Sequence, residues 1–376
     1  MKILHTADLH LGKLLYGVSL IEEQKKFVEE VLYKTIENEK PDVLVISGDI
    51  YDRGIAPISA IELFENLIVT INKKYKTPII MISGNHDSPE RLSLASELLK
   101  ESGVYICTKI KDAFTPVTFS DNGVDYDFWL LPFFEPIQAK EFYKDDNING
   151  FNECYQKILE DIKSNFKEGN VNILLAHNFV TGYKLSGGES PVYVGTSGEV
   201  SAELFEEFGY VALGHIHSPQ RIKENIYYSG SPLKYSFDEA TQKKSLLIVE
   251  FKGKEKEVKK LAVEGLRDVK NLKGTFESLM EQGKKEPDDS FIFVTLTDDN
   301  PVYMPVDRLR DYYKNLLGLK SEYLTRKSEK EFNAIKKTST DEEIFTQFLK
   351  QLCGCEEVEK EDVEMFAKTL KKIKED

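Results

Sequence analysis

The stretch Val43-Leu44-Val45-Ile46-Ser47-Gly48-Asp49-Ile50-Tyr51-Asp52 joins an uninterrupted apolar run to an acidic turn. Continuous runs of large aliphatic residues are typical of parallel strands, because helices cover both faces of a parallel sheet. Asp49 follows the run at the carboxyl end of the expected strand. In open α/β sheets the carboxyl ends of the strands form the ligand crevice. The stretch therefore predicts an α/β sheet with Asp49 at its binding edge.

Four other segments repeat this arrangement of an apolar run followed by polar residues. The runs are Ile3-Leu4-His5-Thr6, Ile79-Ile80-Met81-Ile82, Val171-Asn172-Ile173-Leu174-Leu175 and Tyr210-Val211-Ala212-Leu213. The polar residues that follow them are Asp8 and His10, Asn85-His86-Asp87, His177, and His215 with His217. Each motif alone is also compatible with an ordinary polar turn. Five motifs in the same relation to five strands are instead expected to converge on one edge.

The converging residues carry side chains that bind transition metals. Five of the six histidines in the chain lie in these motifs, together with several aspartates and an asparagine. Imidazole nitrogens, carboxylates and an amide oxygen form a ligand set that suits manganese, zinc or iron. In Gly214-His215-Ile216-His217 the two imidazoles share one face of an extended backbone. The pattern predicts a two-metal hydrolytic centre.

Composition restricts the class of protein. The chain has 376 residues and a formal net charge of −14, which counts against a stand-alone DNA-binding protein but less against a nuclease subunit, because bound metals reverse the local field. No apolar run is long enough to span a membrane, and the start does not resemble a signal peptide. The four cysteines show no framework spacing, although Cys353-Gly354-Cys355 could be half of a metal or redox site. We expect a cytoplasmic protein without a membrane partner.

The pattern of apolar residues divides the chain into four parts. An α/β domain is expected over residues 1–255, a small α+β capping domain over 256–318, a polar linker over 319–339 and a helical hairpin over 340–376. In the first domain, Ser19 with Glu22 and Ser88-Pro89 are predicted to cap helices. In the hairpin, Thr340 and Glu343 form a predicted capping box.

The two helices of the hairpin have apolar stripes that need a surface to cover them. These stripes are either ordinary core or a partner-docking face, and the preceding polar linker favours docking by helix-in-groove packing. The aromatic residues most suited to anchor such a partner are Phe345, Phe348 and Phe366.

The motifs together resemble the calcineurin-like metallophosphoesterase superfamily. Within it, the chain is similar to the SbcD family of nuclease subunits of SbcC–SbcD DNA-repair complexes. This similarity rests on His5-Thr6-Ala7-Asp8-Leu9-His10-Leu11-Gly12, on residues 48–54, on Gly214-His215-Ile216-His217 and on Tyr228-Ser229-Gly230-Ser231-Pro232. It covers roughly residues 1–250. The resemblance implies a phosphoesterase sandwich of two mixed sheets flanked by helices, followed by the capping domain and the C-terminal helices.

The resemblance also implies a set of ligands for two divalent ions, most simply Mn²⁺ with Mg²⁺ as the alternative. The first ion would be held by Asp8, His10, Asp49 and His217. The second would be held by Asp49, Asn85, His177 and His215. Asp49 would bridge them, as a carboxylate with two anionic oxygens can. His86 would be catalytic and act on the phosphate or the leaving oxygen, with Asp87 orienting it.

Two positions leave alternatives open. Archaeal and eukaryotic relatives tend to carry histidine where this chain has Asp52, so the exonuclease role of that position is in doubt here, and a turn acid is the other interpretation. The glycine-rich segment Lys184-Leu185-Ser186-Gly187-Gly188-Glu189 is either a loop that faces DNA or a dimer partner, or a plain surface loop.

The activity implied is hydrolysis of DNA phosphodiester bonds, as an exonuclease at double-strand ends and an endonuclease on hairpins and single strands. It would serve DNA repair, recombination and replication in the cytoplasm, associated with the nucleoid. The protein would act as a homodimer, and an SbcC-type ATPase bound to the C-terminal helices would handle ATP, because the chain lacks a Gly-x-x-x-x-Gly-Lys-Ser/Thr loop. The alternatives are a phosphoesterase of small molecules or phosphoproteins and a catalytically silent scaffold.

Overall fold

A computed structural model of the chain describes residues 1–184, 198–325, 340–352, 358 and 360–375. The chain forms two compact units, Met1–Asn271 and Leu272–Asp376. Within the described ranges, no helix is both long and apolar enough to cross a membrane.

The first unit contains two six-stranded mixed sheets. In the first sheet, β1 (Lys2–Thr6), β4 (Val43–Ser47), β5 (Ile79–Ile82) and β6 (Val104–Cys107) run parallel. On the other side of β1, β15 (Ser245–Lys252) pairs antiparallel with β1, and β16 (Glu255–Ala262) pairs antiparallel with β15. In the second sheet, β14 (Ile226–Tyr228), β12 (Tyr210–Gly214), β9 (Val171–His177) and β8 (Val124–Leu130) are parallel. Its antiparallel edges are β13 (Gln220–Arg221) and β7 (Val117–Asp121).

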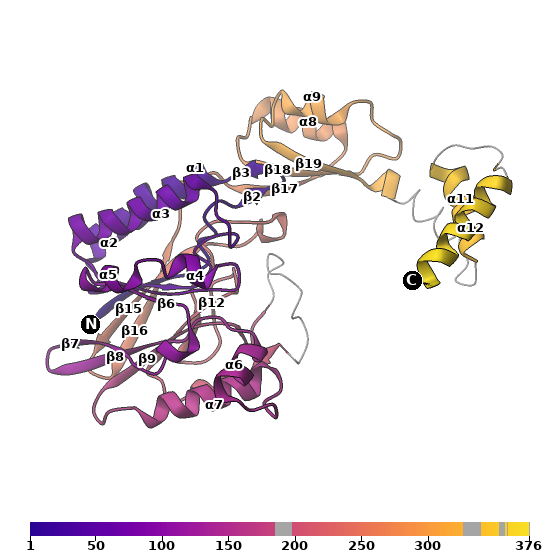
Figure 1. Cartoon of the computed structure of the whole chain (residues 1–376). Helices are drawn as coiled ribbons and strands as arrows, with labels where there is room; N and C mark the ends of the chain where they lie inside the picture. The colour runs from indigo at the N-terminus through magenta and orange to yellow at the C-terminus, as the bar shows by residue number, and fades with distance from the viewer. Residues whose placement is uncertain (185–197, 326–339, 353–357, 359, 376) are drawn as a thin grey trace. The chain divides into compact units, whose positions relative to one another are not determined.

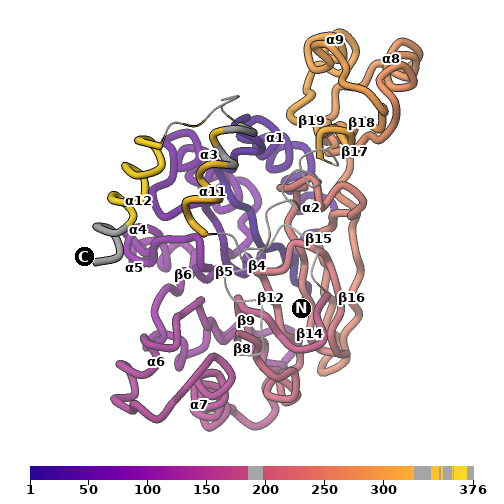
Figure 2. The backbone as a smooth tube through the Cα atoms, turned by 90° about the vertical axis from the view of Figure 1, so that its right-hand side faces the viewer, coloured from indigo at the N-terminus to yellow at the C-terminus, as the bar shows by residue number. Residues whose placement is uncertain are grey.

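The sheets pack face to face over a shared apolar core. Ile3 and Val45 from the first sheet meet Ile173 and Ala212 from the second. Helices cover the outer faces, with α3 (Ile58–Thr70) on one side of the unit and α7 (Gly150–Ser164) on the other (Figures 1 and 2). The predicted sandwich of two mixed sheets flanked by helices is confirmed.

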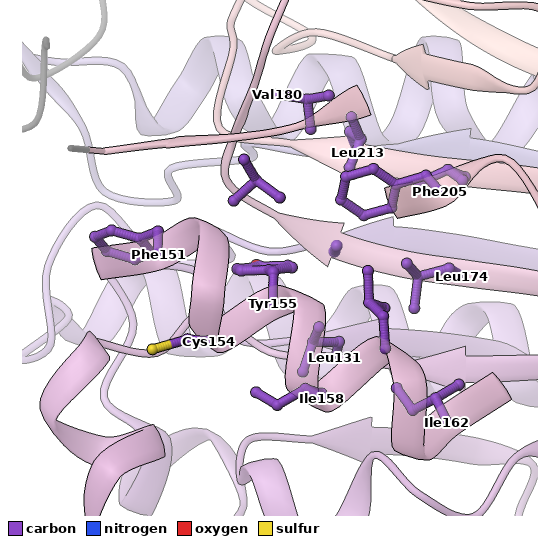
Figure 3. Packing of buried hydrophobic residues seen from close by; sticks show 14 of the residues in the cluster. Leu131, Phe151, Cys154, Tyr155, Ile158, Ile162, Leu174, Val180, Phe205 and Leu213 are labelled. Carbon is purple, nitrogen blue, oxygen red and sulfur yellow. The ribbon is translucent and has the colours of Figure 1, made fainter. Parts of the chain in front are cut away.

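The helix α7 shows how the outer layer is fixed. Its spacing puts Phe151, Tyr155, Ile158 and Ile162 on one buried stripe, as an amphipathic helix requires. Figure 3 shows this stripe facing side chains of the second sheet, among them Leu174. This layer holds β9 and β12 in place behind the residues that follow them.

The first helix begins later than the sequence predicted. Val18–Ser19 forms β3, which pairs with β2 (Leu14–Leu15), so Ser19 belongs to a small hairpin. Helix α1 (Ile21–Lys26) starts after Leu20 and has no side-chain cap, so the predicted Ser19–Glu22 capping box is wrong. It continues through a wider π-helical segment, η1 (Phe27–Leu32), into α2 (Tyr33–Glu39). The predicted cap at Ser88 is confirmed, because its hydroxyl accepts the backbone N–H of Arg91 at the start of α4 (Pro89–Leu92).

The second unit begins with a small α+β fold. Strands β17 (Val269–Gly274), β18 (Phe291–Leu296) and β19 (Leu316–Ser321) form a sheet, against which α8 (Phe276–Lys285) and α9 (Pro305–Arg310) pack through a separate apolar cluster. The first unit extends past residue 255 to Asn271: it includes β16, which pairs with β15 along its whole length, and the boundary falls within β17.

The C-terminal helices are α11 (Asp341–Leu352) and α12 (Lys360–Glu375). The Thr340–Glu343 capping box forms as predicted: the backbone N–H of each residue donates to the side chain of the other, at 3.0 and 3.3 Å. Phe345 and Phe366 stack on each other with ring centroids 4.2 Å apart. The side chain of Phe348, the Cys353–Cys355 pair and residues 185–189 lie outside the described part of the chain.

Candidate metal centre

The strand-end residues singled out from the sequence come together at one place. Strands β1, β4 and β5 are neighbours in the first sheet, and β9 and β12 are neighbours in the second, so their carboxyl ends form a common edge. Three groups have ligand atoms that all lie within 4.8 Å of one another. They are Asp8, His10 and His217; Asp49, His177 and His215; and His10, Asp49 and His86.

In the first group, ring nitrogens and a carboxylate oxygen lie close together. His10 Nε2 lies 3.1 Å from His217 Nε2, although a neutral imidazole nitrogen that lacks a proton can only accept. Asp8 Oδ1 accepts the backbone N–H of His215 at 2.9 Å, whereas Asp8 Oδ2 is buried without a hydrogen-bond partner. Burial raises the pKa of Asp8 to about 6, despite the opposing effects of His177 and His217. A cation at this point would satisfy all three groups, so they fit a metal.

In the second group, the acceptors converge more closely. His177 Nδ1 donates to the carbonyl oxygen of Ser47 at 2.8 Å, so Nε2 is the nitrogen that the neutral ring offers to a metal. This Nε2 lies 3.1 Å from Asn85 Oδ1 and 3.3 Å from Asp49 Oδ2. His215 Nδ1 lies 2.9 Å from the same Asn85 oxygen. Two ring nitrogens, an amide oxygen and a carboxylate oxygen at these distances are the ligand set of a divalent cation site.

Asp49 lies between the two groups. Its Oδ2 is 3.6 Å from His10 Nε2 and 3.3 Å from His177 Nε2. Burial alone would raise the pKa of this carboxyl, but His177, His10 and His86 together hold the pKa well below its usual range. Asp49 is therefore the carboxylate that reaches both groups, as expected of a bridging ligand.

The backbone at the site adopts conformations that non-glycine residues seldom tolerate. Asp8, His10, Asp49 and His215 have φ values of 53°, 42°, 50° and 91°. Such left-handed residues cost energy and persist where surrounding structure enforces them, frequently at functional sites. Close packing supplies that enforcement here: a Cβ on Gly84 would lie 2.2 Å from Asp49 Oδ1.

His86 is oriented differently from the expectation. Its Nδ1 lies 2.8 Å from the backbone carbonyl oxygen of Asp52, which makes Asp52 rather than Asp87 its orienting partner. The Asp87 carboxylate instead accepts backbone N–H groups of Ile50, Tyr51 and Gly84, at 2.9 to 3.1 Å. The predicted role of Asp87 toward His86 is wrong, because these three donors already hold its carboxylate away from the imidazole.

Asp52 also has a side-chain partner. Its Oδ1 lies 2.8 Å from Lys13 Nζ and 3.6 Å from His10 Nδ1. The carboxylate is therefore more than a turn acid: it neutralises a lysine at the rim of the first group and faces the second nitrogen of His10.

Sequence reasoning missed two charged residues beneath the site, Glu239 and Lys244. Glu239 Oε1 accepts His217 Nδ1–H at 3.0 Å, and Glu239 Oε2 lies 2.5 Å from Lys244 Nζ. Neither residue follows an apolar strand in the way the motif residues do. A buried acid five positions before a buried lysine has no recognisable spacing signal, so only the structure identifies them.

Comparisons with known proteins agree with this geometry. Residues 1–219 match the family described as calcineurin-like phosphoesterase, and residues 265–352 match the family described as type 5 capsule protein repressor C-terminal domain. The D subunit of the SbcCD nuclease from Staphylococcus epidermidis (strain ATCC 12228 / FDA PCI 1200) is 34% identical over 94% of this chain and 93% of its own length.

The protein of the same name from Staphylococcus saprophyticus subsp. saprophyticus is 36% identical over 86% of this chain and 85% of its own length. Among solved structures, the NAD nucleotidase NadN of Haemophilus influenzae is 13% identical, with a TM-score of 0.36 over 93% of this chain and 70% of that chain. That structural likeness is too low to carry an inference.

Proposed function

The chain belongs to the calcineurin-like phosphoesterase family and, within it, to the D subunits of SbcCD nucleases, and we propose that it is a metal-dependent nuclease that hydrolyses DNA phosphodiester bonds. It would act as an exonuclease at double-strand ends and as an endonuclease on hairpins and single strands. The observation that supports this most is the convergence of ligand atoms from Asp49, Asn85, His177 and His215 within bonding reach of a common cation.

The metal ligands we propose are those predicted from the sequence. Asp8, His10, Asp49 and His217 would hold one ion, and Asp49, Asn85, His177 and His215 the other. Bound divalent ions, Mn²⁺ in our proposal with Mg²⁺ as the alternative, neutralise charge on a phosphate and lower the pKa of water. The imidazoles and the asparagine complete both ligand sets without adding negative charge that would repel the substrate.

His86 is the residue we assign to the reacting phosphate. Its Nδ1 is engaged by the Asp52 carbonyl oxygen, so its Nε2 is the nitrogen left to face a substrate. The imidazole stacks edge-on against His10 with centroids 4.7 Å apart, which fixes its plane beside the first group. When protonated, it can donate to a phosphate oxygen or to the leaving oxygen.

A hairpin-ended DNA duplex incubated with Mn²⁺ tests the proposal. We expect cleavage that EDTA abolishes and that fails in the Asn85→Ala variant. The same preparation is assayed on cyclic nucleotides, nucleotides and phosphopeptides. Faster hydrolysis of one of those substrates than of DNA would favour the phosphoesterase alternative, and no hydrolysis of any substrate with both ions bound would favour the scaffold.

We further propose that the C-terminal hairpin docks an SbcC-type ATPase. Phe345 and Phe366 pack on each other, so they stabilise the hairpin itself rather than a partner contact alone. Ile344 and Met365 are exposed, at 42% and 68%, and are available to contact another protein. Their exposure supports the docking interpretation of the two apolar stripes.

Deletion of residues 340–376 tests this docking. The shortened protein should keep its fold and its cleavage of DNA ends but lose the ATPase partner in a pull-down. In the full chain, Ile344→Asp with Met365→Asp should also weaken docking, whereas Leu324→Asp, a similarly exposed apolar position outside the hairpin, should not. Undiminished binding of the partner by the shortened protein would exclude the hairpin as the docking site.

The assembly and location that we propose are a homodimer in the cytoplasm, associated with the nucleoid. Exposed apolar side chains are present for a protein interface at the start of α3, where Ile55, Ile58 and Ile61 are 70%, 73% and 47% exposed. Sedimentation of the isolated protein, with Ile58→Asp as the variant, would show whether a dimer forms through this surface.

A further inference from the structure

A buried ion pair lies directly behind one histidine of the metal centre. Glu239, at the end of the short helix η6 (Phe237–Glu239), is fully buried, and Lys244, just before β15, is 6% exposed. Their charged atoms are 2.5 Å apart. The other carboxylate oxygen of Glu239 accepts His217 Nδ1–H at 3.0 Å. The carboxylate of Glu239 therefore links the ammonium group of Lys244 to the imidazole of His217.

The surroundings hold this pair in one arrangement. Lys244 Nζ also donates to the carbonyl oxygen of His217 and to Ser231 Oγ, both at 2.9 Å. The backbone N–H of Tyr235 donates to Glu239 Oε2 at 3.3 Å. Two charges removed from water are costly unless every proton and lone pair finds a partner. Here the partners include both the backbone and the side chain of a single residue, His217, so the pair is built around that histidine.

The chemistry of a carboxylate determines the proton position on His217. An ionised carboxylate only accepts hydrogen bonds, so the proton of a neutral His217 must be on Nδ1. Its Nε2 then carries the lone pair of the ring, and this atom faces His10 Nε2 at 3.1 Å. Burial alone would raise the pKa of Glu239, but His217 and Lys244 lower it to about 2.

The other imidazole of the same group lacks such support. His10 Nδ1 is buried and, within the described part of the chain, has no hydrogen-bond partner. The nearest carboxylate oxygen, Asp52 Oδ1, is 3.6 Å away, beyond hydrogen-bonding distance. Asp52 forms its ion pair with Lys13, which is partly exposed, whereas Glu239 forms its ion pair with the buried Lys244. The two histidines of one proposed metal site are thus held unequally, and His217 is the better fixed of the two.

We propose that Glu239, paired with Lys244, is the positioning residue of the first metal site: it fixes the orientation and the Nδ1–H tautomer of His217, so that Nε2 is presented to a divalent cation. The assignment rests on the proposed function only in naming that cation. Carboxylates behind metal-binding histidines commonly act in this way and raise metal affinity.

Glu239→Gln tests the proposal, because glutamine has nearly the same shape but a different hydrogen-bonding pattern. The ammonium group of Lys244 can only donate, so the amide oxygen of the introduced glutamine should turn toward it. The NH₂ group then faces His217 Nδ1 and forces that nitrogen to accept, which moves the proton to Nε2 and blocks the ligand. We expect one of two Mn²⁺ sites to weaken by about 10- to 100-fold, and the other to be unchanged.

Two measurements on the full chain give this result without an assay of activity. Mn²⁺ titration followed by electron paramagnetic resonance counts the sites and their affinities. Long-range proton–nitrogen correlation of ¹⁵N-histidine protein without metal, recorded at a pH at which the ¹⁵N shifts show a neutral ring, reports the tautomer of His217. The His217→Ala spectrum assigns its signals. The matched control is Glu203→Gln, which alters an exposed carboxylate paired with Lys223 and outside the metal-binding motifs.

The double variant Glu239→Gln with Lys244→Met separates positioning from simple stability. Without the lysine, the amide oxygen of the introduced glutamine can turn back and accept His217 Nδ1–H again. Metal affinity should therefore recover, even though loss of the Lys244 hydrogen bonds lowers thermal stability further. A merely structural pair would show no such recovery.

The inference is overturned if neutral His217 in the parent protein carries its proton on Nε2, a measurement that needs no variant to fold. It is equally overturned if Glu239→Gln, shown to be folded by circular dichroism, binds two Mn²⁺ ions as tightly as the parent. Because these outcomes concern metal binding and tautomer, a failure of the nuclease proposal would appear separately, as intact metal binding without DNA cleavage.

Discussion

Asp49 Oδ1 accepts the backbone N–H of His86 at 2.9 Å. The carboxylate that reaches both groups of predicted ligands thus also anchors the segment that carries the predicted catalytic histidine. Its second oxygen remains directed toward His10 and His177. One side chain therefore couples metal binding to the position of His86, and changes at Asp49 should affect both.

Replacing Asp49 with alanine is expected to disable both metal sites together. His217→Ala serves as the comparison, because it removes a ligand from the first group only. Elemental analysis of the purified variants should find neither ion at stoichiometric level in the first and one ion in the second. One intact site in Asp49→Ala would contradict the bridging assignment.

His86→Ala should lower the rate of DNA cleavage by about 100-fold or more while both metals stay bound. The reason is that the variant loses the imidazole that contacts the reacting phosphate, not a metal ligand. The measurement is metal content alongside cleavage rate. His86 does lie within 4.8 Å of His10 and Asp49 ligand atoms, so the experiment discriminates between two real possibilities. Loss of metal from this variant would show His86 to be a ligand.

Gly84→Ala tests how closely the backbone must approach the bridging carboxylate. The new Cβ would lie 2.2 Å from Asp49 Oδ1 and 2.4 Å from the Asp49 backbone nitrogen, so Asp49 must move. We expect a loss of about 1–3 kcal/mol in the free energy of unfolding, together with weaker binding of both ions. The control is Gly54→Ala, whose Cβ would make an ordinary 3.5 Å contact with Ser88. Equal effects of the two substitutions would exclude close packing as the cause.

His5 should make the metal-free protein less stable in mild acid. Burial lowers its pKa from 6.5 to about 3, and its neutral ring is already held by the Tyr210 hydroxyl at 2.9 Å. Below pH 6.5 this histidine is protonated in the unfolded chain but remains neutral in the folded chain. The free energy of unfolding therefore falls as the pH falls from 6.5 toward 3.

Because of this histidine, the free energy of unfolding should fall by roughly 1.4 kcal/mol for each pH unit below the pKa of the histidine in the unfolded chain. Urea unfolding at about pH 7.5 and pH 5, with EDTA present, should therefore show about 2 kcal/mol more loss for the parent than for His5→Gln. An identical pH dependence of the two proteins would show that His5 binds a proton equally well in the folded and the unfolded protein.

The sequence was sufficient to predict the sandwich and the residues that meet at its edge. Those predictions depend on a chain-level regularity: an apolar strand that ends in a polar residue, repeated at Asp8, Asp49, Asn85, His177 and His215. Strand ends in neighbouring positions of a sheet must be close in space, so the regularity translates directly into geometry.

Predictions that depended on local hydrogen-bond competition were less accurate. Ser19 fits a helix cap by composition, but pairing of β3 with β2 placed it in a hairpin. Asp87 is next to His86 in the chain, yet three backbone donors from two different loops hold its carboxylate. Glu239 could not be found at all, because its partner His217 is 22 residues earlier and only folding brings the two side chains together.

The position of β1 in the first sheet has a consequence for how the protein is made. This strand lies between β4 and β15, and its antiparallel partner β15, which is made much later, ends only at Lys252. Contacts between such distant segments form slowly, because a long loop must close first. The nascent chain therefore cannot pair both edges of β1, the strand that positions Asp8 and His10, until most of the first unit has been synthesised. We expect pulse proteolysis of stalled chains to show protection of β1 only after β15 has emerged.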